Sequence, residues 1–263
     1  MYLRAKILFF FLFCMSCIYL FALSLRDIEQ NEPKIARFIY PCDRTLEGRR
    51  RIWTSPPVVV ADFSLIFFWN VKSGSTYWKR LLQIIQRINC KYAFMGLKYV
   101  HNQNEIIKFI KNDSWIKATF VREPRERILS SYLGIGKDDL HMNCSCGRTV
   151  SSFLEFVEVI KQCKDRHWTP QVNLPKQFYK NMMIGKMSDI STFTELLLRR
   201  IGVWNETIKT FLGSKRMYSL TQSHAKNATQ KLLNYYNTTE LQNSIFHMFA
   251  EDYEVFKFSK AYF

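Results

Sequence analysis

The sequence predicts an α/β fold with a mainly parallel sheet. Two apolar runs, 65–69 and 115–121, have the length and composition of buried strands. Each run ends in a short polar loop, and each loop leads into a segment whose apolar residues recur at helical spacing. A further short apolar piece, 182–187, follows more helical segments, so strands alternate with helices along the chain.

The first residues are expected to anchor the protein in a membrane. Residues 1–6 are short and basic, and residues 7–25 are almost wholly apolar and carry no charge. A run of this kind can cross a bilayer core of ~30 Å. Its flanking charges place the N-terminus in the cytosol and the remainder in the lumen. The alternative is a cleaved signal peptide, but the length and bulky side chains of the run favour a retained anchor.

Behind the anchor we expect a luminal stem, 26–57, and a single folded domain, 58–263. The stem holds several prolines and a run of three arginines, which are typical of a linker. Five N-glycosylation sequons support the luminal placement, beginning at Asn112, Asn143, Asn205, Asn227 and Asn237.

Seven cysteines are present, and two of them, Cys14 and Cys17, lie in the apolar run. The other five would be luminal, where disulfides persist: Cys42, Cys90, Cys144, Cys146 and Cys163. Because five is odd, at least one thiol is free or pairs with another chain. The Cys144-x-Cys146 spacing is too tight for a usual zinc knuckle, so no metal site is expected.

The chain is strongly basic, with 38 Lys and Arg against 22 Asp and Glu and a net charge of +16. An excess of this size steers anions toward the surface. In a cytosolic protein it would indicate nucleic acid. In a luminal protein the expected anions are nucleotide cofactors and acidic polysaccharides, and no nucleic-acid partner is expected. The sequence leaves the oligomeric state open.

The first strand leads into the polar loop Lys72-Ser73-Gly74-Ser75-Thr76. A strand, a loop of small residues and a helix N-terminus make a phosphate cradle, because the first amides of a helix are unsatisfied and carry partial positive charge. Lys72 adds a full charge, and three hydroxyls add donors. The lysine precedes the glycine, so the loop is not a Walker A motif. The alternative is an ordinary turn between a strand and a helix.

The second strand leads directly to Arg122, at the carboxyl end where open α/β sheets bind ligands. Pro124 suits the first turn of the helix that follows, and Ser130 could face the same anion as Arg122. Arg125 and Arg127 are expected to pair with neighbouring glutamates on the surface of that helix. Capping boxes predict three further helix starts, at Ser152, Thr192 and Thr239.

Two segments resemble motifs of the Golgi carbohydrate sulfotransferases of the chondroitin and dermatan type. Residues 71–80 are similar to the PKxxxTxWKR loop that binds the 5′-phosphosulfate end of PAPS (3′-phosphoadenosine 5′-phosphosulfate). Residues 120–132 are similar to the FVRxPxERLxSxY segment that binds its 3′-phosphate. The pair His167-Trp168, Gly185-Lys186 downstream and the aromatic segment 249–256 agree with the family in order and spacing, so the resemblance covers roughly residues 50–263.

The sequence departs from the family pattern in places. Val71 stands where the family usually has proline, and the cysteine pair that commonly follows His-Trp is missing. These departures concern the acceptor pocket and the disulfides more than the cofactor site.

The resemblance implies a P-loop-like, three-layer sulfotransferase fold, with 58–263 as the catalytic domain in the Golgi lumen. It implies PAPS as donor, an acidic glycan or glycosaminoglycan as acceptor, and no metal. Lys72 is expected to contact the 5′-phosphate and the bridging oxygen, where charge grows as the S–O bond breaks. The other expected cofactor residues are Ser73, Gly74, Ser75, Thr76, Tyr77, Trp78, Arg122 and Ser130. The helical spacing of Trp78 also favours a place in the core.

A base must accept the proton of the acceptor hydroxyl, and histidine is the usual choice near neutral pH. The candidates are His167, which stands in a motif, and His101, which lies between the cofactor motifs where related sulfotransferases carry a catalytic histidine or glutamate. Two other functions stay open. One is a non-catalytic relative that binds glycosaminoglycan, which Val71 weakly favours. The other is a luminal P-loop kinase, which the absent GK[ST] disfavours.

Overall fold

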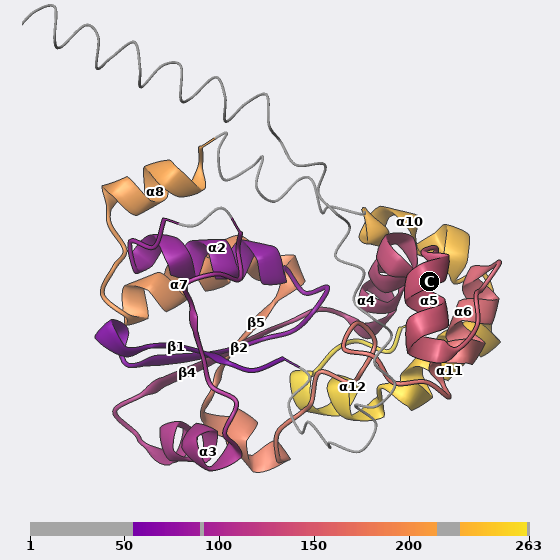
Figure 1. The fold of residues 1–263 in the computed structure, drawn as a ribbon, viewed down its shortest axis with the longest axis horizontal. Helices are drawn as coiled ribbons and strands as arrows, with labels where there is room; N and C mark the ends of the chain where they lie inside the picture. Colours follow the sequence, from indigo (N-terminus) through magenta and orange to yellow (C-terminus); the bar gives the residue numbers. More distant parts are fainter. Residues whose placement is uncertain (1–54, 90–91, 215–226, 262–263) are drawn as a thin grey trace, which may run out of the picture. The chain divides into compact units, whose positions relative to one another are not determined.

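The computed structural model describes residues 55–89, 92–214 and 227–261 (Figure 1). The expected cytosolic tail, 1–6, and membrane anchor, 7–25, lie outside these residues, as does most of the expected stem, 26–57. Within the described part, no helix combines the length and the apolar character that a membrane span needs.

A five-stranded mixed sheet stands at the centre of the fold, in the order β3-β1-β2-β4-β5. Its strands are β1 (Val58–Val60), β2 (Leu65–Trp69), β3 (Lys98–Tyr99), β4 (Ile116–Val121) and β5 (Met183–Lys186). β2 and β4 are parallel, as are β4 and β5, whereas β1 is antiparallel to β2 and to β3. The two predicted motifs therefore follow the carboxyl ends of two parallel strands, β2 and β4. In contrast, β1 forms a hairpin with β2 through the short turn η2 (Ala61–Phe63).

Helices cover both faces of this sheet (Figure 1). One face packs against α2 (Ser75–Ile85), α7 (Ile190–Arg200) and α8 (Glu206–Leu212), and the other packs against α3 (Gln103–Lys111). Alternate residues of β2 serve the two cores: Phe67 and Trp69 face α2 and α7, while Ile66 and Phe68 face α3. All of β2 is buried, which explains why the strand appears in the sequence as a continuous apolar run.

A second group of helices packs beside the sheet around a core of its own (Figure 1). Its members are α4 (Pro124–Ser131), α5 (Asp139–Cys146), α6 (Phe153–Ile160), α10 (Ala228–Tyr235), α11 (Thr239–Met248) and α12 (Ala250–Phe256). Short helical turns complete the described chain: η3 (Tyr132–Gly136), η4 (Lys176–Asn181) and η5 (Met187–Asp189). Because α4 begins directly after β4, it joins the sheet to the helical group.

Of the three predicted helix starts, one is confirmed. Ser152 caps α6 and accepts a hydrogen bond from the amide of Glu155. The start at Thr192 is wrong, because α7 already begins at Ile190, which packs on the sheet core with the rest of the apolar face of that helix. The start at Thr239 is one residue late, since the preceding Thr238 provides the capping oxygen.

Candidate active site

The polar loop between β2 and α2, residues 70–74, has the backbone geometry of an anion cradle, and we call it the cradle loop. Lys72 has φ 66° and Gly74 has φ 70°, so both lie in the left-handed region. For a residue with a side chain this conformation is costly, and such strain is concentrated at functional sites. Gly74 is the N-cap of α2 but provides no capping side chain, so the amides of the first turn remain able to bind an anion.

Arg122 brings the second motif to this loop. Its Nη1 donates to the carbonyl of Lys72 over 3.3 Å, and its Nε donates to Glu126 over 3.1 Å. The two segments are neighbours because β2 and β4 are adjacent parallel strands, whose carboxyl ends share one edge of the sheet. Ser130, on α4, is buried.

Gln171 locks the two motifs together from a third segment. Its Oε1 accepts hydrogen bonds from the hydroxyl of Ser73 and from the amide of Arg122, at 3.0 and 2.9 Å. Its Nε2 donates to the carbonyl of Arg122 over 2.8 Å. Ser73 is only 1% exposed. Its hydroxyl is therefore used inside the fold, by Gln171, and the expected role of Ser73 in cofactor binding stays a prediction for its backbone.

Asp252, on α12, in turn holds the backbone at Gln171. Its carboxylate accepts the amides of Gln171 and Val172, each at 2.8 Å to Oδ1. Asp252 is fully buried. Burial raises the pKa of its carboxyl, although these hydrogen bonds and the charge of Arg127 act in the opposite direction.

Arg127 forms a second tie, between the cradle loop and the segment that carries His167. Its guanidinium donates to the carbonyls of Val71, Thr169 and Arg166 at 3.0, 2.8 and 3.2 Å. Burial lowers the pKa of Arg127 to about 10. The expectation of a surface ion pair is wrong for Arg127, because α4 is buried on nearly every side. Arg125 does pair with Glu123, at 2.8 Å, but also in the interior.

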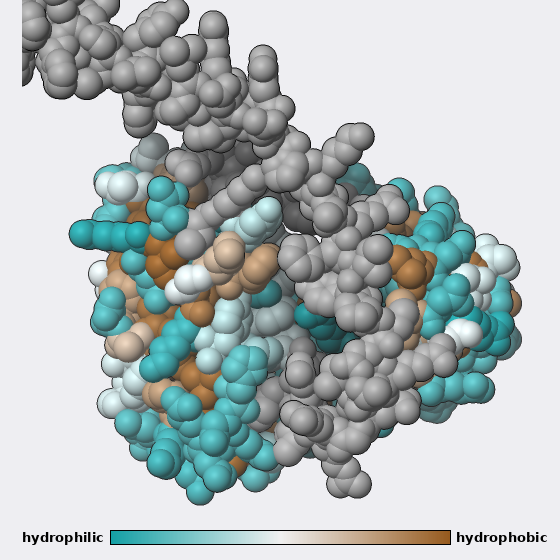
Figure 2. Space-filling view, in the orientation of Figure 1, coloured by the Kyte–Doolittle hydropathy of each residue, from teal (hydrophilic) through white to brown (hydrophobic). Residues whose placement is uncertain are grey.

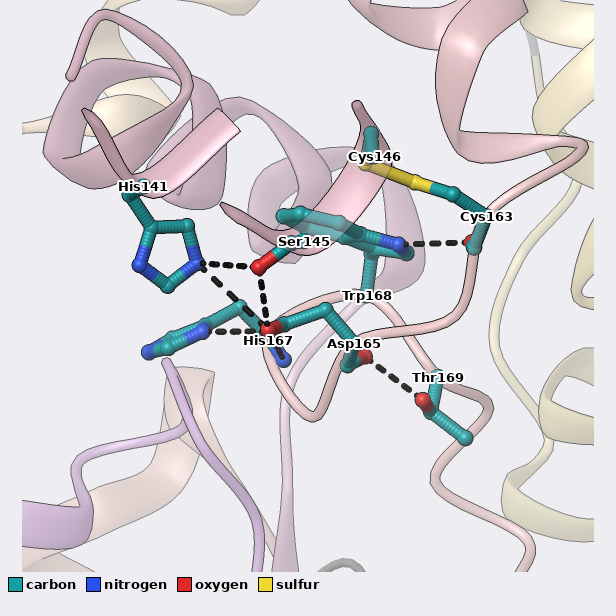
Figure 3. The surroundings of a disulfide bond; sticks show 8 residues. All are labelled: His141, Ser145, Cys146, Cys163, Asp165, His167, Trp168 and Thr169. Carbon is teal, nitrogen blue, oxygen red and sulfur yellow. Dashed lines mark hydrogen bonds and ion pairs between the residues drawn. A yellow bond between two sulfur atoms is a disulfide. The ribbon is translucent and has the colours of Figure 1, made fainter. Parts of the chain in front are cut away.

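His167 lies in a hydrogen-bonded cluster with Asp165 and His141 (Figure 3). Its Nδ1 lies 2.5 Å from Asp165 Oδ1, and Nε2 of His141 lies 3.4 Å from the other oxygen, Oδ2. Ser145, on α5 like His141, donates to Oδ2 over 3.1 Å. Figure 3 shows the second ring nitrogen of His167 pointing away from Asp165. A disulfide between Cys146 and Cys163 joins α5 to the segment that carries the cluster.

The cluster favours a neutral His167 beside an ionised Asp165. Burial lowers the pKa of His167, and although Asp165 opposes this, Arg166 and Lys72 lower the pKa further. Burial alone would raise the pKa of Asp165, but hydrogen bonds from His141 and His167 hold it well below its ordinary value. The charge of Lys72, on the cradle loop, therefore also acts at His167.

The atoms of this cluster are close enough to hold a metal ion, since those of His141, Asp165 and His167 lie within 4.8 Å of one another. The carboxylate, however, already has hydrogen-bond donors from both histidines and from Ser145. Positive charge from Arg166 and Lys72 also acts on the cluster. In the structure these side chains are linked by hydrogen bonds, and the expectation that no metal binds stays a prediction.

Further positive charge surrounds the site. Nζ of Lys79 lies 3.3 Å from the centre of the Trp69 ring. Burial, together with the charge of Arg166, lowers the pKa of Lys79 to about 8. Burial and a neighbouring cation both disfavour the charged form of a lysine, and an anion that binds nearby stabilises that charged form.

Two predicted residues direct their side chains away from the loop, and a third, His101, follows another strand. Trp78 is fully buried and packs its ring on Phe67 and Phe120, so its side chain belongs to the core and is not available to a cofactor. Tyr77 turns its hydroxyl to Thr194 on α7, 3.0 Å away, so only its backbone remains for the predicted cofactor contact. His101 is exposed between β3 and α3, at the same sheet edge as the loop but two strands away from β2.

The sequence does not reveal Gln171, Asp252, Asp165, His141 or Arg127 as site residues. Three of them stand in or next to segments that resemble the family: Asp165 is two residues before His167, Gln171 follows the same segment, and Asp252 lies within 249–256. Their residue types gave no sign of contacts across the fold.

Comparison with known proteins identifies one family. A model of the sulfotransferase family matches residues 56–259, which include the sheet and the described helices. Comparison with curated proteins and with solved structures found no match.

Proposed function

The chain belongs to the sulfotransferase family, and we propose that it transfers a sulfuryl group from PAPS to a hydroxyl of an acidic carbohydrate in the Golgi lumen. The observation that carries this proposal is the contact between the guanidinium of Arg122 and the carbonyl of Lys72. This contact unites two anion-binding segments in one site, and the candidate base His167 lies within reach of the charge on Lys72.

The residues of the site fit the donor. PAPS carries one phosphate at each end of its ribose, and when bound it supplies an activated sulfuryl group on a phosphate leaving group. The left-handed loop and the open first turn of α2, with Lys72, Ser75 and Thr76, would hold the 5′ end. Arg122 and Ser130 would hold the 3′-phosphate, and an arginine can make two parallel hydrogen bonds to such a group.

His167 would act on the acceptor side of the reaction. As the hydroxyl oxygen of the acceptor forms its bond to sulfur, His167 takes the hydroxyl proton on Nε2 while Nδ1 stays hydrogen-bonded to Asp165. Lys72 neutralises the charge that develops on the phosphate as the S–O bond breaks. The low pKa of His167 keeps its ring neutral and able to accept a proton near pH 7.

A carbohydrate acceptor and a luminal setting are supported by several independent features. The two motifs resemble those of the chondroitin and dermatan sulfotransferases, and the net charge of +16 suits an anionic polymer. The disulfide between Cys146 and Cys163 suits an oxidising compartment. The expected signal anchor, 7–25, would make the protein a single-pass type II membrane protein of the Golgi.

The non-catalytic alternative receives little support from the site. Its sequence argument is Val71, which replaces a proline. The structure uses Val71 through its carbonyl, which accepts from Arg127, and proline would offer the same carbonyl. The replacement therefore leaves this tie to the cradle loop intact.

A transfer assay tests the proposal. The full chain is incubated with radiolabelled PAPS and with desulfated chondroitin, dermatan, heparan and N-glycan acceptors. We expect label on one acceptor class and losses of roughly 100- to 1,000-fold in Lys72→Ala and Arg122→Ala. The exposed residues Lys231 and Arg200 provide charge-matched controls, and Lys231→Ala and Arg200→Ala should keep full activity.

Thermal shift with PAP, the desulfated nucleotide, separates binding from transfer. Saturation at 100 times its Kd should stabilise the wild type by about 2.7 kcal/mol. The shift should shrink in Lys72→Ala and Arg122→Ala but not in the two controls. Failure of both label transfer and the PAP shift would rule out the proposed function.

A further inference from the structure

His141 is linked to the proposed base, His167, through Asp165, and it has no role in the reaction described above. It lies on α5, while Asp165 and His167 lie on the segment after α6. The two histidines bind different oxygens of one carboxylate, His167 at Oδ1 and His141 at Oδ2. Asp165 is therefore shared between them (Figure 3).

We propose that His141 is a positioning residue of the transfer reaction. By binding the second oxygen of Asp165, it fixes the carboxylate in the orientation that presents His167 to the acceptor hydroxyl. This inference rests on the proposed function, in which His167 is the base.

The orientation of Asp165 is built by contacts from both sides. Its Oδ1 also accepts the backbone amide of His167 at 2.8 Å, and its Oδ2 accepts the hydroxyl of Ser145 at 3.1 Å. The backbone carbonyl of Asp165 accepts the hydroxyl of Thr169 at 2.6 Å. His141 adds a second contact to Oδ2, so each oxygen of the Asp165 side chain has two contacts.

Helix α5 is itself fastened to the segment that it orients. Cys146, its last residue, is bonded to Cys163, two residues before Asp165. The ring of His141 also lies edge-on to the rings of His167 and Trp168, with ring centres 5.3 and 6.3 Å apart. His141 is therefore placed by a covalent link as well as by packing, which is what a positioning role requires.

The charges that face the cluster determine the sign of the expected effect. Lys72 from the cradle loop and Arg166 from the same segment oppose protonation of His167, and Asp165 favours it. Arg127, on α4, attracts Asp165. Each donor to Asp165 spreads its negative charge, so that less remains to stabilise a protonated His167. Removal of the donor His141 should thus raise the pKa of His167.

Variants at position 141 separate hydrogen bonding from packing. His141→Phe keeps a ring against His167 and Trp168 but cannot donate, whereas His141→Gln can place an amide donor near the position of Nε2. His141→Phe should raise the pKa of His167, move the acid limb of kcat/KM to higher pH and lower kcat by about 10- to 100-fold at neutral pH. His141→Gln should stay near the wild type in all three quantities.

Asp165→Asn should shift the pKa of His167 in the opposite direction, downward. It removes the charge that favours a protonated His167, so the acid limb should move to lower pH. The loss in kcat should reach roughly 1,000- to 10,000-fold, as for other histidine bases that lose their carboxylate. His247→Gln, at an exposed position on α11, is the matched control and should change nothing.

The pKa of His167 is measured directly by NMR titration of histidine side chains in the full chain, beside the pH profile of kcat/KM. Wild-type values in His141→Phe would overturn the inference, because packing and not hydrogen bonding would then explain His141. So would micromolar binding of Zn²⁺ alone to the wild type that His141→Phe abolishes, since the cluster would then be a metal site. If the wild type transfers no sulfuryl group, the proposed function fails, while the NMR titration still tests the coupling of His141 to His167.

Discussion

Asp252 shows how much of the site depends on one residue that no ligand is expected to touch. Its fully buried carboxylate holds the backbone of Gln171 and Val172, and Gln171 holds both the cradle loop and Arg122. The charge of the buried Arg127 compensates part of its own. A substitution at Asp252 would therefore affect the position of the cradle loop through one intervening side chain, that of Gln171.

Asp252→Asn tests this dependence. The amide would place an N–H₂ group against the backbone amides that now donate to Asp252. It would also leave Arg127 with Asp165 alone of its two counter-charges. We expect the free energy of unfolding in urea to fall by about 3 kcal/mol. Glu254→Gln, on the same helix, removes only an exposed ion pair with Lys176 and should cost less than about 0.5 kcal/mol. Equal losses in the two variants would contradict the argument.

At the scale of elements, α5 is the part of the site with the least support of its own. It has eight residues, and Met142 is its buried residue. A helix this short does not persist by itself in water. Covalent bonds add to this support: Cys146 is bonded to Cys163, across 17 residues, and Cys144 is disulfide-bonded as well.

Removal of the disulfide between Cys146 and Cys163 should therefore loosen α5 first. The double variant Cys146→Ser/Cys163→Ser avoids a leftover thiol and should lose about 3 kcal/mol of stability. Hydrogen exchange should speed up at residues 139–146, while α6, at 153–160, serves as the internal control because it is buried along one face. Uniform acceleration of both helices would show that the disulfide stabilises the fold globally and not α5 in particular.

The elements that the sequence predicts well are those with a strong periodic pattern. β2, β4 and β5 fall on the predicted apolar runs, and Pro124 begins α4 as expected. β1 and β3 are not predicted, because they are short strands paired in an antiparallel way, with only three and two residues to carry a pattern. Parallel neighbours also explain why Lys72 and Arg122 could be expected at one edge.

The rest of the site depends on contacts that a linear pattern does not contain. Arg127 resembles a solvated helix residue in the sequence, because charged neighbours at helical spacing suggest surface ion pairs. Its burial follows from the packing of other elements around α4. Tyr77 likewise shares the motif with Lys72, but the rotation of α2 turns it toward Thr194.

For the whole molecule, charge is the dominant property. The net charge is +16, and on the face of the described part that Figure 2 shows, hydrophilic residues predominate over apolar ones. Long-range attraction of an anionic polymer to such a protein is screened by salt, with a Debye length of about 10 Å at 0.1 M and 3 Å at 1 M.

We therefore expect the KM for a polyanionic acceptor to rise at least about tenfold between 50 and 500 mM NaCl, with little change in kcat. The rise should be much smaller for a short, neutral acceptor that carries the same hydroxyl. Initial rates at several salt concentrations give both constants. A KM that does not change with salt for the polymer would show that the net charge does not take part in acceptor binding.

The junction at Gln171 also bears on how the protein is made. Gln171 binds Ser73, 98 residues before it, and Asp252, 81 residues after it. The ribosome synthesises β2 and the cradle loop long before α12. The early part of the chain can therefore fold around its sheet before Asp252 is present to hold Gln171. The proposed nucleotide site would then be completed late in biosynthesis. A chain interrupted before α12 would reach cellular quality control with a formed sheet and an unsupported cradle loop.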